Sequence, residues 1–226
     1  MLTAVPSLAA LLPGPGQAAV FATAVFVLNA TPGVDFLLTV SRTLQAGARA
    51  GITAALGIMA GCVLHALAAA FGLAALLAVN PGAFRLIQWA GAAYLVWLGV
   101  GMLRQAWRRD AQTPVISEGA RPPRRSAWAD FRTGVLTNVL NPKVAFFFLA
   151  FIPQFVPAGS PAPTLSFLLL GAWFVAQGLL FLLFLVAVAA RLKRLNASPV
   201  ARRVLNAVGG LLFVGLAVRL SKPVGA

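Results

Sequence analysis

Acidic residues, cysteine and histidine are scarce in this sequence of 226 residues, which has four Asp and Glu, one Cys and one His. The single cysteine, Cys62, excludes an intramolecular disulfide framework and a CxxC redox or zinc motif. One histidine and one acidic residue within the apolar runs do not supply a metal site of ordinary ligand spacing, so no cofactor is expected. Charged residues form only 10% of the chain against 60% hydrophobic residues, which excludes an ordinary soluble domain.

Long apolar runs take the place of the missing charge. Residues 50–82 carry no charge apart from His65, residues 131–165 carry only Arg132 and Lys143, and residues 164–190 carry none. A helix needs about 20 apolar residues to cross a hydrocarbon layer of about 30 Å. These runs therefore predict transmembrane helices, and the lipid bilayer is the expected surrounding of the chain.

The predicted fold class is an all-α integral membrane protein with six transmembrane helices. Hydropathy and the helix breakers Gly and Pro place these helices near residues 17–40, 51–79, 84–104, 131–156, 164–190 and 203–220. The last helix is the shortest, and the arginines at its ends can extend toward the membrane interfaces. No positively charged segment precedes the first helix, so we expect no cleaved signal peptide.

Two halves of three helices each are predicted, residues 1–104 and 131–226, joined by a basic cytosolic linker at 105–130. An odd number of helices in each half makes the second half enter the membrane from the opposite side, which is typical of an inverted-topology repeat. Residues 29–35 resemble residues 138–144, with Pro32 matching Pro142, and residues 88–91 resemble residues 206–209. The matches occur in the same order in both halves and favour the repeat.

Basic residues give the chain a net charge of +14, which by itself would be compatible with a nucleic-acid partner. A nucleic-acid surface, however, needs its charges gathered on a water-facing fold, whereas these charges lie between apolar spans. Fourteen of the 18 basic residues fall in the first, third and fifth loops, within 42–49, 104–132 and 191–203. We therefore expect no nucleic acid, cytoplasmic loops on this side, and both termini in the periplasm.

Prolines interrupt the first and fourth predicted helices at Pro32, next to Gly33, and at Pro142. A proline within a span removes a backbone donor and frees polar backbone groups near mid-depth. Polar neighbours that can satisfy the freed groups, or line a solute cavity, are Asn29, Thr31, Asn138 and Asn141. The alternative is a tolerated kink that is capped by the amides.

Asp35 and Lys143 stand at nearly equivalent positions of the two halves. A charge within the bilayer costs several kcal/mol and is kept where it pairs or acts. If both face one cavity, Asp35 can hold a substrate amino group and Lys143 a substrate carboxylate, which predicts a small zwitterionic solute such as an amino acid. Two alternatives stay open: a simple interhelical ion pair, or an Asp35 that is hydrated near the cytosolic end.

His65 shares one helical face with Gly57 and Gly61, at a spacing of four residues. The glycines permit close helix packing. A lone histidine that faces a bundle interior can titrate near neutral pH, so His65 and Asp35 are the candidate residues for coupling transport to protons. A buried, neutral, hydrogen-bonded histidine is the alternative.

Several segments, taken in order, resemble the lysine exporter and homoserine/threonine resistance (LysE/RhtB) family of bacterial amino-acid exporters. The segments are 31–35, 41–42, 47–51, 55–57, Gly61, 91–99, 131–134 and 138–143. The resemblance covers nearly the whole chain and implies proton-driven efflux of amino acids or related metabolites across an inner membrane. Val34 stands where the family motif has the second proline of Pro-Gly-Pro.

Three classes of function are considered for a membrane protein with these residues. The leading hypothesis is a secondary active, proton-coupled exporter of amino acids or related metabolites, and its small-residue faces are compatible with a homodimer. The alternative is an exporter or channel for inorganic ions or metals, against which the scarcity of acidic ligands counts. A membrane enzyme would need an acid–base pair, and Asp35 with His65 is the sole candidate, so we expect no enzyme.

Overall fold

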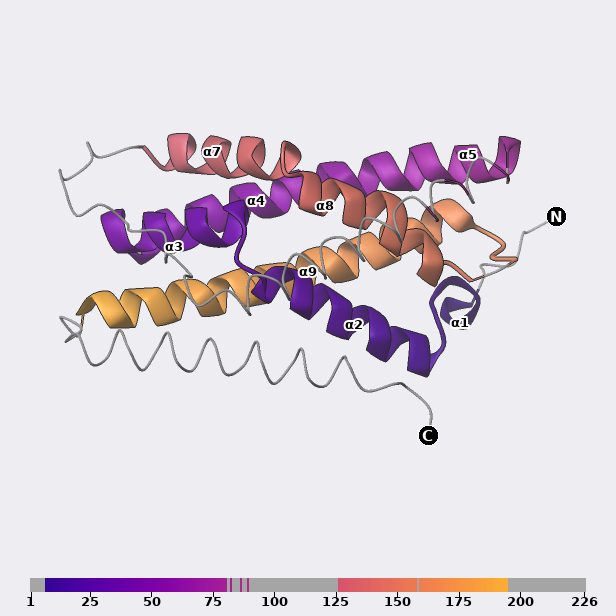
Figure 1. The fold of residues 1–226 in the computed structure, drawn as a ribbon, viewed down its shortest axis with the longest axis horizontal. Helices are drawn as coiled ribbons and strands as arrows, with labels where there is room; N and C mark the ends of the chain where they lie inside the picture. The colour runs from indigo at the N-terminus through magenta and orange to yellow at the C-terminus, as the bar shows by residue number, and fades with distance from the viewer. Residues whose placement is uncertain are drawn as a thin grey trace.

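A computed structural model describes residues 7–80, 82, 86, 89, 126–157 and 159–194, and all regular structure in these residues is helical. The first group of elements is α1 (Leu8–Leu11), α2 (Pro15–Ala30), α3 (Val34–Ala46), α4 (Ala48–Ala68), the π-helix η1 (Ala69–Leu73) and α5 (Ala74–Val79). The second group is α7 (Ala127–Val139), α8 (Pro142–Phe146), the π-helix η2 (Phe147–Phe151), the 3₁₀-helix η3 (Ile152–Phe155) and α9 (Pro163–Arg194). Figure 1 shows these helices side by side along one axis.

Two of the helical segments are straight and long enough to cross a membrane. They cover Ala48–Leu76 and Pro163–Leu192, with 29 and 30 residues. At 1.5 Å per residue each is about 44 Å long, more than the hydrocarbon thickness. The helices predicted at 51–79 and 164–190 are therefore confirmed.

Two further spans are interrupted. The α2–α3 pair is bent by 54° and the α7–α8 pair, with its continuation to Phe155, by 52°. Pro32 lies within the first interruption and Pro142 begins α8, so each of the two prolines coincides with an interruption. The two spans run in opposite directions, and both interruptions lie near the middle of the molecule (Figure 1).

The described residues thus contain up to four spans. The helices predicted at 84–104 and 203–220 lie outside the described part of the chain, apart from two single residues. The six-helix count and the inverted repeat remain predictions. The opposite directions of the two bent spans are nonetheless what an inverted repeat requires of its first and fourth helices.

Glycines let α4 and α7 approach each other closely. A Cβ atom at Gly57 would meet the backbone carbonyl of Phe131, and one at Gly134 would meet the carbonyl of Ala54. Such contact between small residues is a common way for helices to pack in a bilayer, where apolar burial alone does not drive association. This face of α4 also carries Gly61 and His65, in agreement with the predicted spacing.

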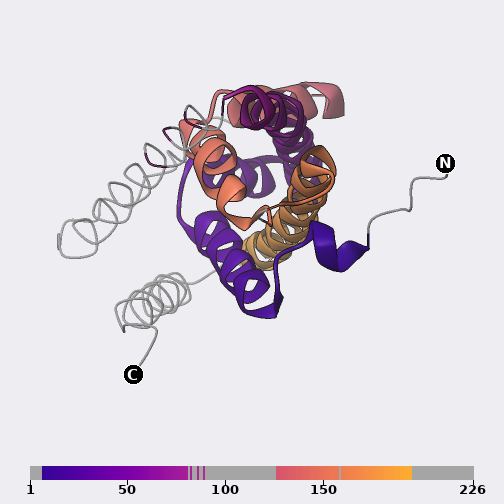
Figure 2. The same ribbon diagram turned by 90° about the vertical axis from the view of Figure 1, so that its right-hand side faces the viewer.

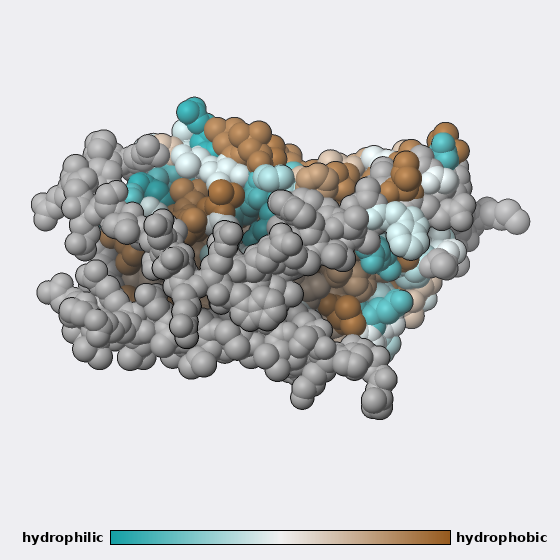
Figure 3. Space-filling model, in the orientation of Figure 1, coloured by the Kyte–Doolittle hydropathy of each residue, from teal (hydrophilic) through white to brown (hydrophobic). Residues whose placement is uncertain are grey.

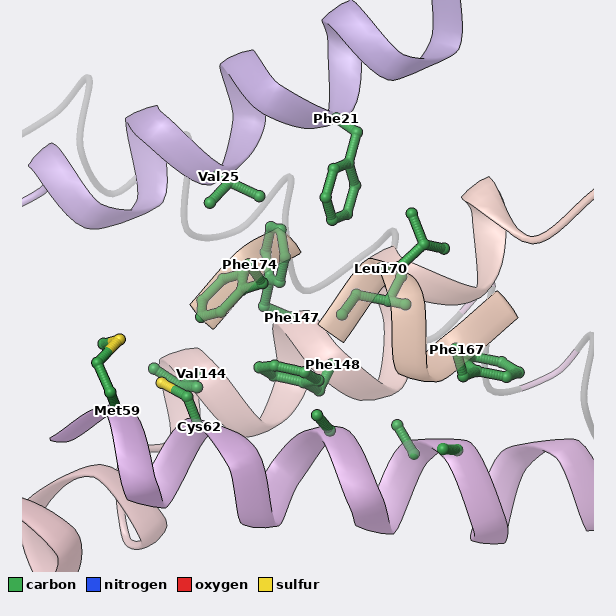
Figure 4. Packing of buried hydrophobic residues seen from close by; sticks show 14 of the residues in the cluster. Phe21, Val25, Met59, Cys62, Val144, Phe147, Phe148, Phe167, Leu170 and Phe174 are labelled. Atoms are coloured by element: carbon green, nitrogen blue, oxygen red, sulfur yellow. The ribbon is translucent and has the colours of Figure 1, made fainter. Parts of the chain in front are cut away.

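Aromatic rings fill the interior between η2, which follows α8 in the second bent span, and the helices α2 and α9 (Figure 4). The Phe147 ring lies 4.6 Å from Phe151 and 5.2 Å from Phe174 of α9, between ring centroids, and Phe148 lies 4.9 Å from Phe174. On the other side, Phe21 of α2 is fully buried. Each aromatic pair contributes about 0.5–1.5 kcal/mol beyond its buried area. The cluster fixes η2 against α2 and α9.

Large apolar side chains remain on the outer surface. Leu180 and Phe184, one turn apart on α9, are 70% and 64% exposed. Figure 3 shows extensive brown, apolar areas among the described residues, and the end-on view in Figure 2 shows the helices arranged around a common interior. An apolar surface around a packed interior is the expected arrangement when lipid is the solvent.

Two charged residues lie elsewhere than the hydropathy pattern predicts. Arg42, expected in the first loop, lies within α3 and is 5% exposed, because α3 continues to Ala46 and one residue, Gly47, separates it from α4. Asp130, expected at the end of the linker, lies within α7 and is 2% exposed. Both charges are tolerated inside the helix bundle because they pair with each other.

Candidate substrate site at the helix breaks

The interruption after α2 exposes backbone carbonyls that a continuous helix would have bonded internally. Lys143, in the first turn of α8, donates from Nζ to the carbonyl oxygens of Leu28 at 2.9 Å and Thr31 at 3.1 Å. A Cβ at Gly33 would lie 3.2 Å from Nζ, so the glycine leaves room for the ammonium group. A cation at the C-terminal end of a helix is also favoured by the helix dipole.

The second interruption directs two amides at the first bent span. Asn138 and Asn141 both donate from Nδ2 to Oδ2 of Asp35, at 2.8 and 3.0 Å. Asn141 also caps α8, because its Oδ1 accepts a hydrogen bond from the backbone nitrogen of Lys143 at 3.1 Å. Both amide residues are buried, which makes these bonds expensive to lose.

The two interruptions therefore satisfy each other. Lys143 of the second bent span bonds the open end of α2, while Asp35, in the first turn of α3, receives the amides of the second span. Asp35 keeps one buried oxygen, Oδ1, that has no hydrogen-bond partner within the described residues. An ionised carboxylate with an unused oxygen can accept a further donor.

Asp35 and Lys143 line one cavity but do not form the simple ion pair that was the alternative. Within the described ranges, Arg42–Asp130 is the ion pair with nitrogen and oxygen inside 4.0 Å. Asp35 also does not lie at the end of the bundle, because it follows the break directly and α3 continues for eleven residues beyond it. The hydrated-end alternative is thus disfavoured.

The cavity between the breaks has a volume of about 20 Å³, enough for about one water molecule. Its polar lining is Asn29, Thr31, Asp35 and Lys143, and its other lining residues are Leu28, Phe36, Ile58, Met59, Cys62, Val144, Phe174 and Leu182. The cavity, as lined by the described residues, is too small for an amino acid. Figure 4 shows Met59 and Cys62 on α4 facing Val144.

Asn29 and Thr31, two predicted site residues, bond mainly to their own helix. Asn29 donates from Nδ2 to the carbonyl of Val25 at 2.8 Å, and the Thr31 hydroxyl donates to the carbonyl of Val27 at 2.6 Å. Both nevertheless line the cavity, and Thr31 contributes a backbone carbonyl to Lys143. The structure thus brings together all the polar residues predicted around the two breaks.

His65 lies one step away from this cavity. Its Nε2 is 3.2 Å from the backbone carbonyl oxygen of Asn138, and because that oxygen can only accept, Nε2 is the donor. The imidazole also stacks on Phe148, with centroids 5.9 Å apart. His65 therefore connects to Asp35 through Asn138 rather than by direct contact.

Arg42 and Asp130 form the contact that sequence reasoning missed. Arg42 Nη2 lies 2.6 Å from Asp130 Oδ1, and Arg42 Nη1 donates to Gln45 Oε1 at 3.1 Å. A signal was present in the spacing: Arg42 follows Asp35 by seven residues and Asp130 precedes Asn138 by eight. Each interval is about two helical turns, so the residues of each pair share a helix face.

The sequence matches one protein family and several membrane proteins of bacteria. The family model for LysE type translocators matches residues 26–222. An uncharacterized membrane protein of Pseudomonas aeruginosa is 37% identical over 195 residues, which are 84% of this chain and 88% of the relative. The homoserine/homoserine lactone efflux protein of Salmonella typhimurium is 27% identical over 188 residues, 83% and 87% of the two chains. The leucine efflux protein of an Enterobacter species is 28% identical over 197 residues, 87% and 90%. No solved structure matches.

Proposed function

Because the chain belongs to the LysE type translocator family, we propose that it exports amino acids or related small metabolites across the bacterial inner membrane by secondary active, proton-coupled transport. The chain is a multi-pass membrane protein, and two relatives are named for efflux of homoserine, its lactone, or leucine. The observation that carries the proposal is that opposite charges from two facing helix breaks, Asp35 and Lys143, line one cavity. This matches the two charged groups of a free amino acid.

The substrate-binding roles follow from the hydrogen-bond donors and acceptors that these groups have left. The ammonium group of Lys143 has three donors, two of which bond the carbonyl oxygens of Leu28 and Thr31 at the end of α2, so one remains for a substrate carboxylate. Asp35 Oδ1 accepts a hydrogen bond from the substrate amino group, while Asn138 and Asn141 hold the Asp35 carboxylate in place through Oδ2. Asn29 and Thr31 line the same space and complete the polar wall.

Proton coupling is assigned to Asp35 and His65. A proton and a substrate ammonium group compete for the same carboxylate, because protonation removes the charge that binds the ammonium group. Entry of a proton at Asp35 therefore favours release of the substrate, which is the exchange an antiporter needs. His65 is coupled to Asp35 through Asn138, whose backbone carbonyl accepts from the imidazole and whose side-chain amide donates to Asp35, so a change in the charge of His65 alters how Asn138 holds the carboxylate.

The orientation in the membrane follows from the basic residues. The α3–α4 turn, the beginning of α7 and the end of α9 lie at the same end of the molecule (Figure 1). These are the described borders of the three basic loops, so this end is proposed to face the cytoplasm and the termini the periplasm. A homodimer remains a prediction from the small-residue faces.

The test is transport in inside-out vesicles that contain the purified protein. Uptake of a panel of radiolabelled amino acids is measured with and without an imposed proton gradient, for wild type, Asp35→Asn and Lys143→Ala. Arg49→Gln is the control, since Arg49 is exposed and lies outside the site. We expect gradient-driven uptake of at least one amino acid, abolished in both site variants and retained in the control.

Two results would contradict the proposal. If no amino acid moves under any gradient, while the same vesicles conduct inorganic ions or metals, the alternative class of ion or metal exporter takes its place. If uptake persists in folded Asp35→Asn and Lys143→Ala protein, the two charges are structural and the solute binds elsewhere.

A further inference from the structure

The contacts between α3 and α7 have a regular arrangement that the substrate site does not explain. The two helices run antiparallel (Figure 1) and are joined at two levels. Asp35 and Asn138 join them beside the cavity, and Arg42 and Asp130 join them about two turns, or about 11 Å, farther along. The second contact thus lies between the cavity and the end of the molecule where α3 turns into α4.

The polar side chains of α3 between these two levels are buried. Thr39 and Thr43 of α3 are 0% exposed, and their hydroxyls bond the carbonyls of Asp35 and Thr39. Arg42 and Asp130 are buried next to them. Within the described ranges, a solute that leaves the cavity along the α3–α7 seam therefore meets these side chains.

The ion pair is incompletely satisfied. The buried Nε of Arg42 has no hydrogen-bond partner among the residues that the structure describes. A buried ion pair gains little net stability once the desolvation of both charges is counted, and least when its donors are not all used. When the seam opens to water, hydration of both charges offsets the lost contact, which is what a repeatedly opened closure requires.

We infer that Arg42 and Asp130 are the gate residues that close the α3–α7 end of the solute pathway, and that they separate when the cavity opens to that side. This inference rests on the proposed transport function, because alternating access needs a closure on each side of the site. Arg42 and Asp130 act by positioning α3 against α7 and do not touch the solute. Opening of this end requires α3 and α7 to separate at the level of the ion pair.

The chain contains its own probe for this gate. Cys62 is the single cysteine of the sequence, is 1% exposed, and lines the cavity. Its reaction with a membrane-impermeant maleimide, added to one side of sealed vesicles at a time, reports which side of the cavity is open. The measurement needs no transported solute, so its result is independent of whether the exporter proposal survives.

The experiment compares wild type with Arg42→Gln, Asp130→Asn and the charge-exchanged double variant Arg42→Asp/Asp130→Arg. We expect each single variant to label Cys62 at least tenfold faster from the α3–α7 side and at the wild-type rate from the other side. The double variant should return to within about threefold of wild type, since it restores an ion pair. Arg49→Gln, which removes the same charge from an exposed position, should label like wild type.

The inference is overturned if folded single variants label at the wild-type rate, if labelling rises equally from both sides, or if Arg49→Gln rises as much. Folding is checked by gel filtration and thermal unfolding of each variant. If the neutral variants do not fold, Arg42→Lys is measured instead, because it keeps the charge but cannot reproduce the guanidinium contact. Faster one-sided labelling of Arg42→Lys supports the gate, and an unchanged rate refutes it.

Discussion

The bent spans and the straight spans of this protein handle backbone hydrogen bonding in different ways. The straight spans, through α4 and α9, are helical without an interruption and contribute glycines and apolar side chains to the interior. The bent spans open their backbone near mid-depth and need partners from outside the helix. Lys143 of the second bent span bonds the open end of α2, and Asn138 and Asn141 of that span bond the Asp35 side chain just after the first break. Polar chemistry inside the bilayer is therefore concentrated where two helices are broken at the same level.

The bent spans therefore carry the polar groups proposed to bind solute, and the straight spans mainly provide packing. Substitutions at the breaks should affect transport strongly, and comparable polar substitutions on the straight spans should affect it little. Four changes test this contrast, beginning with the largest expected effect.

Replacing Lys143 with methionine should have the largest effect. It leaves the carbonyls of Leu28 and Thr31 without their donor and leaves the charge of Asp35 uncompensated. Removing one member of a buried charged network costs about 3–5 kcal/mol. We expect transport to be lost and thermal unfolding to occur at markedly lower temperature. Arg132→Met, on the exposed face of α7, is the matched control and should change neither measurement.

Gly61→Ala should have the next largest effect. Gly61 is on a straight span, but it packs against Asn138, a residue of the second break. An added Cβ would lie 2.7 Å from Asn138 Oδ1 and displace the amide that holds Asp35. Overpacking of this kind costs about 1–3 kcal/mol. Transport should fall about tenfold. Gly72→Ala adds the same methyl group where nothing lies within 4 Å, and transport by that variant should equal wild type.

Asn141 combines two tasks that substitution can separate. Asn141→Ala removes both the α8 cap and a donor to Asp35, whereas Asn141→Ser keeps a capping oxygen and removes the amide donor. The cap alone contributes about 1 kcal/mol. Both variants should therefore transport more slowly than wild type, with the additional loss of thermal stability confined to alanine. Equal melting temperatures for the two variants would show that the cap is dispensable.

Gln177→Leu on α9 should have the smallest effect of the four. Gln177 donates to the carbonyl of Ala22 at 2.7 Å and accepts from the Trp173 indole at 3.1 Å, so it connects two helices away from the breaks. Losing a neutral hydrogen bond costs about 1 kcal/mol. Initial transport rates should stay within about twofold of wild type. A loss as large as that of Lys143→Met would erase the proposed distinction between bent and straight spans.

Sequence reasoning identified the breaks but not their partners. Pro32 and Pro142 act through their own ring and missing donor, which are local properties, so their effect on the helices was predictable. The polar neighbours of both prolines were also predicted to line one site, and the structure places them around the two breaks. That Lys143 bonds carbonyls of α2 rather than Asp35 depends on the distance between two helices 112 or more residues apart, which no local pattern contains.

The ion pair between Arg42 and Asp130 was missed for a related reason. Hydropathy treats every charged residue as one that prefers water, so both were placed in loops at the ends of the spans. A charge can stay within a helix bundle when an opposite charge from another helix compensates it. The matching intervals to Asp35 and Asn138 were visible, but they acquire meaning only once α3 and α7 are known to lie antiparallel.

Gly47 makes α3 a lever. The thirteen residues of α3 form a rod about 20 Å long, with the Pro32–Gly33 break at one end and a single-residue turn at the other. Gly47 has φ of 94°, a conformation that residues with a side chain rarely adopt. Both ends of α3 are therefore formed by residues with special backbone properties, Pro32 and Gly33 at one end and Gly47 at the other. With no slack at Gly47, α3 cannot slide along α4, so its movement is a tilt about that point. Arg42, which lies close to Gly47, then moves less than Asp35, so a small separation at the ion pair accompanies a larger widening of the cavity.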